Sequence, residues 1–155
     1  MSRQDVEIVR RSFGAWNEGD VEAIRRIYTE DVLVAGGSGL GGSLGGGDPI
    51  GRWVADVREP WAEVRWDLER IFDGDGVVVG FYRVFGTGRR SGVEVARDLA
   101  AVYRIRDGLI ASERVYLDRA EALEAAGLQR ADSAFLIDRA PVSLWPSTSA
   151  GTLLV

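Results

Sequence analysis

Glu113 is the residue whose place in the sequence best suits proton-transfer chemistry. It lies in residues 93–117, VEVARDLAAVYRIRDGLIASERVYL, where alternating side chains predict a long antiparallel hairpin that turns at residues 106–108. The other side chains on the face that carries Glu113 are almost all apolar. A carboxyl group in such surroundings has a raised pKa, which suits a general acid or base near neutral pH.

The predicted turn decides which residues lie opposite Glu113. A three-residue turn at residues 106–108, with Gly108 in the left-handed conformation, pairs Ala101 with Glu113. A two-residue Asp-Gly turn shifts the register by one and sets the apolar row against polar side chains. We therefore expect the three-residue turn, and one face of the hairpin then carries Leu99, Ala101, Tyr103, Ile105, Leu109, Ala111, Glu113, Val115 and Leu117.

Arg97 is the second candidate catalytic residue on this face. It is four residues from Ala101, which is about 13 Å along a strand at roughly 3.4 Å per residue, so its side chain barely reaches Glu113. Two alternatives remain open. An arginine neutralises Glu113 in a structural ion pair, or Arg97 lies exposed at the rim of a site.

Aromatic residues supply the other candidate groups of the site. Tyr82 and Tyr103 fall at inward-facing strand positions, where a phenol can donate a hydrogen bond to a developing oxyanion. Together with tryptophans they predict a concave apolar site with a few hydrogen-bond donors, although the same spacing also fits an ordinary core. The expected substrate contacts are Trp16, Phe13, Ser12, Trp53, Trp66, Leu99, Ala101 and Val115.

The residue types that are missing exclude many kinds of chemistry. The chain has no cysteine and no histidine, and all 19 basic residues are arginine. A thiol nucleophile, a Ser-His-Asp triad, a Schiff-base lysine and a zinc site of the usual ligands are excluded, and we expect no cofactor and no metal. The net charge of −5 argues against a nucleic-acid partner. Because there is no run of about 18 apolar residues and no signal-peptide pattern, we expect a cytoplasmic protein without membrane contact.

Four helices and a set of strands are predicted around the hairpin. Helical spacing of apolar residues indicates helices over residues 5–17, 21–28, 48–58 and 118–126, and strands are expected at residues 32–35, 63–72 and 77–85. The last of these strands is apolar on both faces, which predicts that it is covered on both sides. Residues 36–47 hold eight glycines in twelve positions, and we expect a flexible loop there.

The length of 155 residues and the hydrophobic content of 46% fit one domain, which we place at residues 1–128. Residues 129–155 form an extension that is too apolar for a solvated tail. We expect this extension to pack against the domain or against a partner subunit.

The order of these segments and their amino-acid sequences resemble a known family. The segments VEIVRRSFGAWNEGDVEAIRRIYTEDV, VADVREPW and RDGLIASERVYLDRAEALEAAGL resemble the SnoaL-like polyketide cyclase branch of the nuclear-transport-factor-two-like superfamily. The resemblance implies a cone-shaped α+β fold, with three N-terminal helices packed on a curved antiparallel sheet. It also implies a homodimer through the convex sheet face, where Asp98 and Arg114 are expected to point with Ala100 and Val102.

The positions that match functional residues of the superfamily are altered in this chain. The tyrosine and two aspartates of ketosteroid-isomerase-like members match Ser12, Gly36 and Ala101, so the resemblance does not imply steroid-type isomerisation. The Gly-His pair that SnoaL-like members often carry matches Gly46 and Gly47. For the Asp-Arg-Asp arrangement of epoxide-hydrolase-like members, the hairpin offers Arg97 and Glu113 without a third partner.

These observations predict a cofactor-independent cyclase or isomerase that acts on a hydrophobic, polyketide-like small molecule in secondary metabolism. Either Glu113 moves a proton while Tyr82 or Tyr103 stabilises an oxyanion, or the aromatic pocket only folds a reactive substrate for cyclisation. The alternatives are a non-catalytic binder of a hydrophobic small molecule and an epoxide-hydrolase-like enzyme. An interaction module that works through the convex face is a third class.

Overall fold

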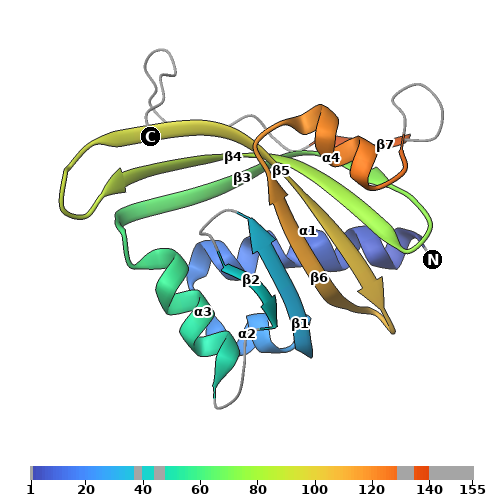
Figure 1. Cartoon of the computed structure of the whole chain (residues 1–155), viewed down its shortest axis with the longest axis horizontal. Helices are drawn as coiled ribbons and strands as arrows, with labels where there is room; N and C mark the ends of the chain where they lie inside the picture. Colours follow the sequence, from blue (N-terminus) through green and yellow to red (C-terminus); the bar gives the residue numbers. More distant parts are fainter. Residues whose placement is uncertain (1, 37–39, 44–47, 129–134, 140–155) are drawn as a thin grey trace.

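A computed structural model describes residues 2–36, 40–43, 48–128 and 135–139 (Figure 1). Its helices are α1 (Ser2–Glu18), α2 (Val21–Arg25), α3 (Pro49–Arg58) and α4 (Arg119–Ala125). Its strands are β1 (Tyr28–Gly36), β2 (Leu40–Ser43), β3 (Trp61–Asp73), β4 (Val77–Gly88), β5 (Glu94–Arg106), β6 (Leu109–Tyr116) and β7 (Phe135–Arg139). No helix in the described part of the chain is long and apolar enough to span a membrane.

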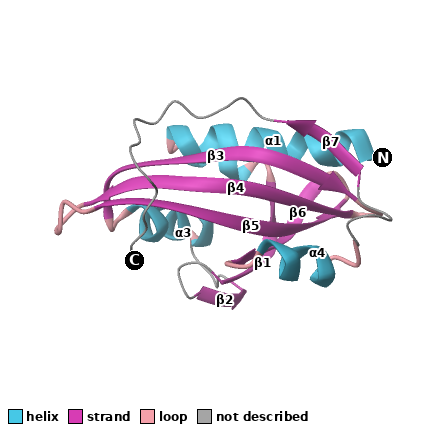
Figure 2. Ribbon diagram, turned by 90° about the horizontal axis from the view of Figure 1, so that it is seen from above, coloured by secondary structure: helices cyan, strands magenta, loops and turns pink. Residues whose placement is uncertain are grey.

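The described strands form one curved sheet in the order β2-β1-β6-β5-β4-β3-β7. Figure 2 shows the long strands β3, β4 and β5 side by side. The first three helices pack on one side of this sheet and α4 packs on the other (Figure 1). This confirms the predicted α+β fold of three N-terminal helices on a curved sheet. The sheet is mixed rather than antiparallel, because β1 pairs with β6 in parallel.

Aspartates begin three of the helices. Asp20 accepts a hydrogen bond from the backbone N–H of Ala23 at 3.1 Å, and Asp118 accepts one from Ala120 at 2.8 Å. Asp48 caps α3, with Pro49 in the first turn. The second helix ends at Arg25 and not at Tyr28 as predicted, because Tyr28 instead pairs with Ile110 of β6.

The prediction that residues 36–47 form a loop is wrong for part of this glycine-rich stretch. The first strand runs on to Gly36. The strand β2 pairs with its end, from Leu33 opposite Ser43 to Gly36 opposite Leu40. Backbone pairing of this kind needs no particular side chain, so the composition gave no sign of it. Residues 37–39 and 44–47, including Gly46 and Gly47, lie outside the described residues.

The predicted three-residue turn of the hairpin is wrong. Arg106 pairs with Leu109, so the turn has two residues, Asp107 and Gly108, both with positive φ (55° and 79°). A register shift follows at once, because the next pairs are Ile105–Ile110 and Arg104–Ser112, which leaves Ala111 as an extra residue.

This bulge restores the alternation of side chains along β6. Glu113 pairs with Tyr103, and Val115 pairs with Ala101, so Glu113 still shares a face with the apolar row. Its neighbour across the strands is a tyrosine instead of the predicted alanine.

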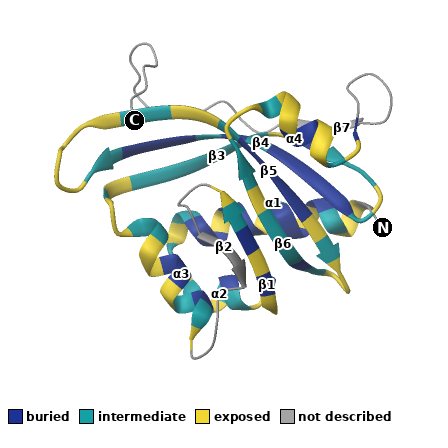
Figure 3. Ribbon diagram, in the orientation of Figure 1, coloured by how far each residue is buried: buried dark blue, intermediate teal, exposed yellow. Residues whose placement is uncertain are grey.

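The sheet separates two cores, which Figure 3 shows as buried segments on both sides of the long strands. The larger core lies between α1–α3 and the concave face and includes Val78 and Tyr82 of β4. The smaller core includes Val77 and Val79 of β4 and is covered by α4. The prediction that this strand is covered on both sides is confirmed.

The strand β7 pairs with the outer edge of β3, from Arg70 opposite Arg139 to Asp73 opposite Phe135. Residues 129–134 and 140–155 lie outside the described residues, so the contacts predicted for the rest of the extension stay a prediction. Contact between subunits through the convex face also stays a prediction. On that face Asp98 forms an ion pair with Arg83 at 2.7 Å.

Candidate active site

A cavity of about 440 Å³ lies between the helices and the concave face of the sheet. Its walls come from α1, β1, α3 and strands β3 to β6, and most of the lining side chains are apolar. Among the described lining residues, Asp56, Arg97 and Glu113 are the ones with side chains that ionise at neutral pH. Of the twelve predicted site residues, all but Ala101 line this cavity: Glu113, Arg97, Tyr82, Tyr103, Trp16, Phe13, Ser12, Trp53, Trp66, Leu99 and Val115.

Ala101 does not line the cavity, contrary to the prediction. It is 0% exposed and lies within the larger core, paired with Gly80 on one side and Val115 on the other. Its side chain is a single methyl group that its neighbours cover completely, so it does not reach the cavity surface.

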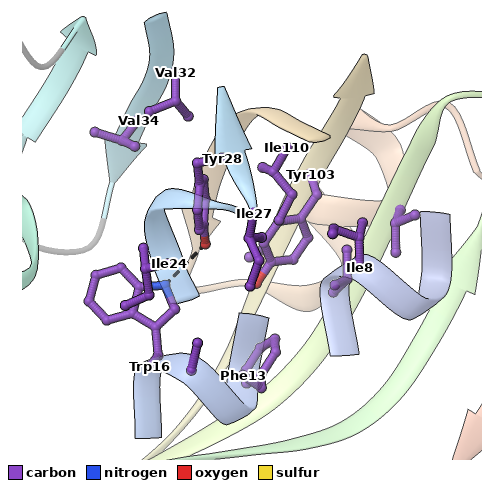
Figure 4. Packing of buried hydrophobic residues seen from close by; sticks show 14 of the residues in the cluster. Ile8, Phe13, Trp16, Ile24, Ile27, Tyr28, Val32, Val34, Tyr103 and Ile110 are labelled. Carbon is purple, nitrogen blue, oxygen red and sulfur yellow. Dashed lines mark hydrogen bonds between the residues drawn. The ribbon is translucent and has the colours of Figure 1, made fainter. Parts of the chain in front are cut away.

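Glu113 is held by a hydrogen-bonded chain from two other elements. The hydroxyl of Tyr28, at the start of β1, donates to Oε1 of Glu113 at 2.6 Å. The indole N–H of Trp16, on α1, donates to the same hydroxyl at 3.1 Å, and Figure 4 shows this bond among the buried residues. Glu113 is half-buried, with part of its side chain facing the cavity.

Burial raises the pKa of Glu113 from its ordinary value of 4.5 to about 7, although the hydrogen bond from Tyr28 acts in the opposite direction. The pKa values of Tyr28, Tyr82 and Tyr103 are all raised, first by burial and then by the charge of Glu113. Near neutral pH the site therefore combines a carboxyl group that can take up or give a proton with phenols that stay protonated as donors.

Tyr82 and Tyr103 line the cavity and have no side-chain hydrogen bond to another described residue. The rings of Phe13 and Tyr82 pack edge to face, with 5.3 Å between their centroids. This packing fixes the tyrosine ring while its hydroxyl remains available to a ligand. The predicted oxyanion donors are thus on the cavity wall together with Glu113.

Tryptophans from three elements form another part of the wall. Trp16 contacts Trp53 and Trp66 edge to face, with centroids 4.9 Å and 5.9 Å apart. Asn17 fixes the backbone of Trp66 with two hydrogen bonds of 2.8 Å, one donated and one accepted. These contacts give the cavity a rigid aromatic wall.

Arg97 is exposed and lies at the edge of the cavity. Because Tyr103 is the residue opposite Glu113, Arg97 is six residues away along β5, which is about 20 Å and not the predicted 13 Å. It forms no ion pair with another described residue. The alternative of an ion pair between Glu113 and Arg97 is therefore wrong, and the rim position is what the structure shows.

Sequence reasoning missed Tyr28 as a site residue. It was placed in the predicted helix over residues 21–28, whereas it is the first residue of β1 and forms a hydrogen bond with Glu113, 85 positions away in the sequence. No local pattern carries this information, because the contact depends on the parallel pairing of β1 with β6. The cavity also includes Val34, Ala35, Gly36, Asp56, Val57, Pro60, Trp61, Val84, Val95 and Leu117, which were not predicted as site residues.

The altered family positions have structural roles here. The Ser12 hydroxyl donates to the carbonyl oxygen of Val9 at 2.7 Å, within α1. Gly36 has a φ of +82°, and a Cβ atom at this position would overlap the carbonyl oxygen of Val115. A side chain of any kind at Gly36 would therefore push β1 away from β6.

Comparisons with known proteins agree with this architecture. The chain is similar to an NTF2-like protein of unknown function from Burkholderia pseudomallei, at 22% identity and a TM-score of 0.66 over 80% of this chain and 97% of that one. It is also similar to a putative SnoaL-like polyketide cyclase from Jannaschia sp. CCS1, at 19% identity and a TM-score of 0.67 over 81% and 92%. A third similar structure is IdmH, a putative polyketide cyclase from Streptomyces antibioticus, at 18% identity and a TM-score of 0.60 over 81% and 99%.

These identities establish the fold alone. No curated protein sequence matches the chain. Residues 9–113, which include α2, α3, most of α1, most of the cavity lining and Glu113, match the SnoaL-like domain. The chain belongs to the SnoaL-like family.

Proposed function

We propose that the protein is a cofactor-independent cyclase or isomerase that acts on a hydrophobic, polyketide-like small molecule. The observation that carries the proposal is the position of Glu113, a carboxyl group with a pKa of about 7 in an apolar cavity next to protonated tyrosines. The family membership supports the reaction class, and the aromatic wall supports the hydrophobic substrate.

The reaction begins with the Glu113 carboxylate, which takes a proton from a carbon next to a substrate carbonyl group. The electron pair of that C–H bond moves toward the carbonyl oxygen and forms an enolate. A hydroxyl group of Tyr82 or Tyr103 donates a hydrogen bond to this oxygen. The protonated Glu113 then returns its proton in one of two ways. It protonates a different carbon of a conjugated enolate, which is an isomerisation, or it protonates the alkoxide oxygen that forms when the enolate carbon attacks a second carbonyl group and closes a ring.

Three alternatives receive less support. Epoxide-hydrolase-like chemistry needs an arginine beside the carboxyl group, and Arg97 lies about 20 Å along the strand from the residue opposite Glu113. For a non-catalytic binder, the supporting observation is the loss of functional groups at Ser12, Gly36 and Ala101. Cyclisation by positioning alone, without acid or base, also remains compatible with the aromatic wall.

Proton exchange at a ketone tests the proposal without knowledge of the substrate. We expect the protein to catalyse exchange of the α-protons of 2-tetralone in D2O, followed by proton NMR. The variant Glu113→Gln should lose about 100-fold or more of this rate, as expected for a general base. Glu124 is exposed on α4, on the other side of the sheet, so the control variant Glu124→Gln should keep the full rate.

Tryptophan fluorescence separates the remaining alternatives, because Trp16, Trp53 and Trp66 line the cavity. Binding of 2-tetralone with no catalysed exchange in the wild-type protein would favour the binder. Equal exchange rates in the wild type and Glu113→Gln would contradict acid-base catalysis by this residue.

A further inference from the structure

Tyr28 occupies the middle of a hydrogen-bonded chain that ends on one oxygen of Glu113. Its side chain is 2% exposed, and its hydroxyl contacts Trp16 Nε1 at 3.1 Å and Glu113 Oε1 at 2.6 Å. Trp16 is itself 8% exposed and packs against Trp53 and Trp66. The three linked groups come from α1, β1 and β6, so their geometry is fixed by the packing of the whole cone.

The direction of the hydrogen bonds follows from the groups themselves. An indole N–H only donates, so it occupies a lone pair of the Tyr28 oxygen. The hydroxyl proton of Tyr28 is then directed to Glu113, since an ionised carboxylate only accepts. Oε1 is therefore already engaged before any ligand enters.

We propose that Tyr28 is a positioning residue, which together with Trp16 reserves Oε1 of Glu113 and leaves Oε2 as the oxygen that exchanges a proton with the ligand. This inference rests on the proposed function, in which Glu113 moves a proton. In the reaction, the substrate proton goes to Oε2 and the same oxygen returns it, while Tyr28 keeps its own proton throughout.

An irregular stretch of β1 places Tyr28 next to Glu113. In the parallel pairing, Tyr28 lies opposite Ile110 and the next paired residue, Leu33, lies opposite Ser112. Between these two pairs the chain moves five residues along β1 but only two along β6. The bulged segment begins directly after Tyr28. The carbonyl oxygen of Ile27 accepts a hydrogen bond from the backbone N–H of Ile110 at 2.9 Å, which fixes the chain just before Tyr28. The position of Tyr28 is thus specified from both sides.

The other groups around Glu113 do not take this role. Tyr103 of β5 and Tyr82 of β4 lie close enough for the charge of Glu113 to raise their pKa values, but neither forms a hydrogen bond with it. On α1, Ser12 donates to the Val9 carbonyl group. The remaining charged groups of the cavity lining are Asp56 and Arg97, and Glu113 forms no ion pair with a described residue. Tyr103 is therefore a matched control for Tyr28, with the same buried phenol but no bond to the carboxyl group.

The test measures the titration of Glu113 in the whole chain, without ligand. Carboxyl carbons are labelled with 13C-glutamate, the Glu113 signal is assigned by its absence in Glu113→Gln, and its pKa is read from NMR spectra across a pH series. Because Tyr28 stabilises the charged form, Tyr28→Phe should raise the pKa of Glu113 by about one pH unit, whereas Tyr103→Phe should leave it nearly unchanged. Equal values in the two variants would overturn the proposal.

A second measurement keeps the test decisive if Tyr28→Phe does not fold. Replacing Tyr28 with 3-fluorotyrosine retains its shape and makes its hydroxyl a stronger donor. The pKa of Glu113 should then fall, while 3-fluorotyrosine at Tyr103 should have no such effect. An unchanged pKa with the fluorinated residue at Tyr28 would contradict the role of this hydroxyl.

The proton-exchange assay distinguishes this inference from the proposed function. If Glu113→Gln exchanges 2-tetralone protons as fast as the wild type, the proposed function fails even where the NMR titration supports the bond from Tyr28. If only the titration fails, Glu113 remains the base and Tyr28 loses its positioning role.

Discussion

At the scale of single residues, the proposed chemistry depends on one carboxyl group in an unusual place. Glu113 was found from the sequence, because an isolated acid in an apolar strand face is visible in the alternation of residues. Its partner Tyr28 was not found, because a bond over 85 positions leaves no local pattern. The sequence thus identified the group that titrates but not the group that orients it.

The raised pKa of Glu113 has a consequence for stability that can be measured. The folded protein holds a proton on this group up to about pH 7, whereas the unfolded chain releases it near 4.5. Folding therefore binds a proton between these values, and the free energy of unfolding should fall as pH rises through this range. The variant Glu113→Gln should lack this loss, and its stability relative to the wild type should increase by on the order of 2 kcal/mol between about pH 5 and about pH 8.

Urea unfolding at several pH values checks this prediction. Glu124→Gln, whose side chain is exposed, serves as the control and should follow the wild-type curve. A constant difference between Glu113→Gln and the wild type at all pH values would show that Glu113 has an ordinary pKa in the folded protein.

At the scale of elements, the sequence predicted the helices better than the sheet edges. Apolar periodicity marked α1, α3 and α4 to within a few residues. The strand β2 and the parallel pairing of β1 were missed, because both depend on backbone contacts between distant segments. The hairpin turn was wrong for a related reason: the two-residue turn was rejected for its register, but a bulge at Ala111 restores that register.

Gly36 shows how such a backbone contact constrains the sequence. Replacing it with alanine should cost about 2 kcal/mol or more, because its φ is positive and the new Cβ would overlap the Val115 carbonyl oxygen. The control variant is Gly14→Ala. Gly14 lies in α1, and no atom is within 4 Å of the position of the added Cβ. It should stabilise the protein by up to about 1 kcal/mol, since alanine favours the helix. Thermal unfolding of both variants tests the contrast, and equal stability would contradict the close approach of β1 to β6.

At the scale of the whole molecule, the cone brings α1, β1 and β6 together around a cavity that no single element could form. The fold and about half of the cavity lining could be predicted from the sequence, because a family resemblance and inward-facing residues both pointed to the concave face. The relative positions of Glu113, Tyr28 and Arg97 could not, since they depend on register shifts in two strands. Dimerisation through the convex face stays a prediction, and α4 covers the part of that face around Ala100 and Val102.

The pH dependence of proton exchange tests the central claim most directly, that Glu113 in this cavity acts as a base near neutral pH. For the wild-type protein, the rate of 2-tetralone exchange should rise with pH and level off above an apparent pKa of about 7, because only the carboxylate takes up the proton. The residual rate of Glu113→Gln should show no such step. A wild-type profile without a step near pH 7, or the same step in Glu113→Gln, would contradict the account.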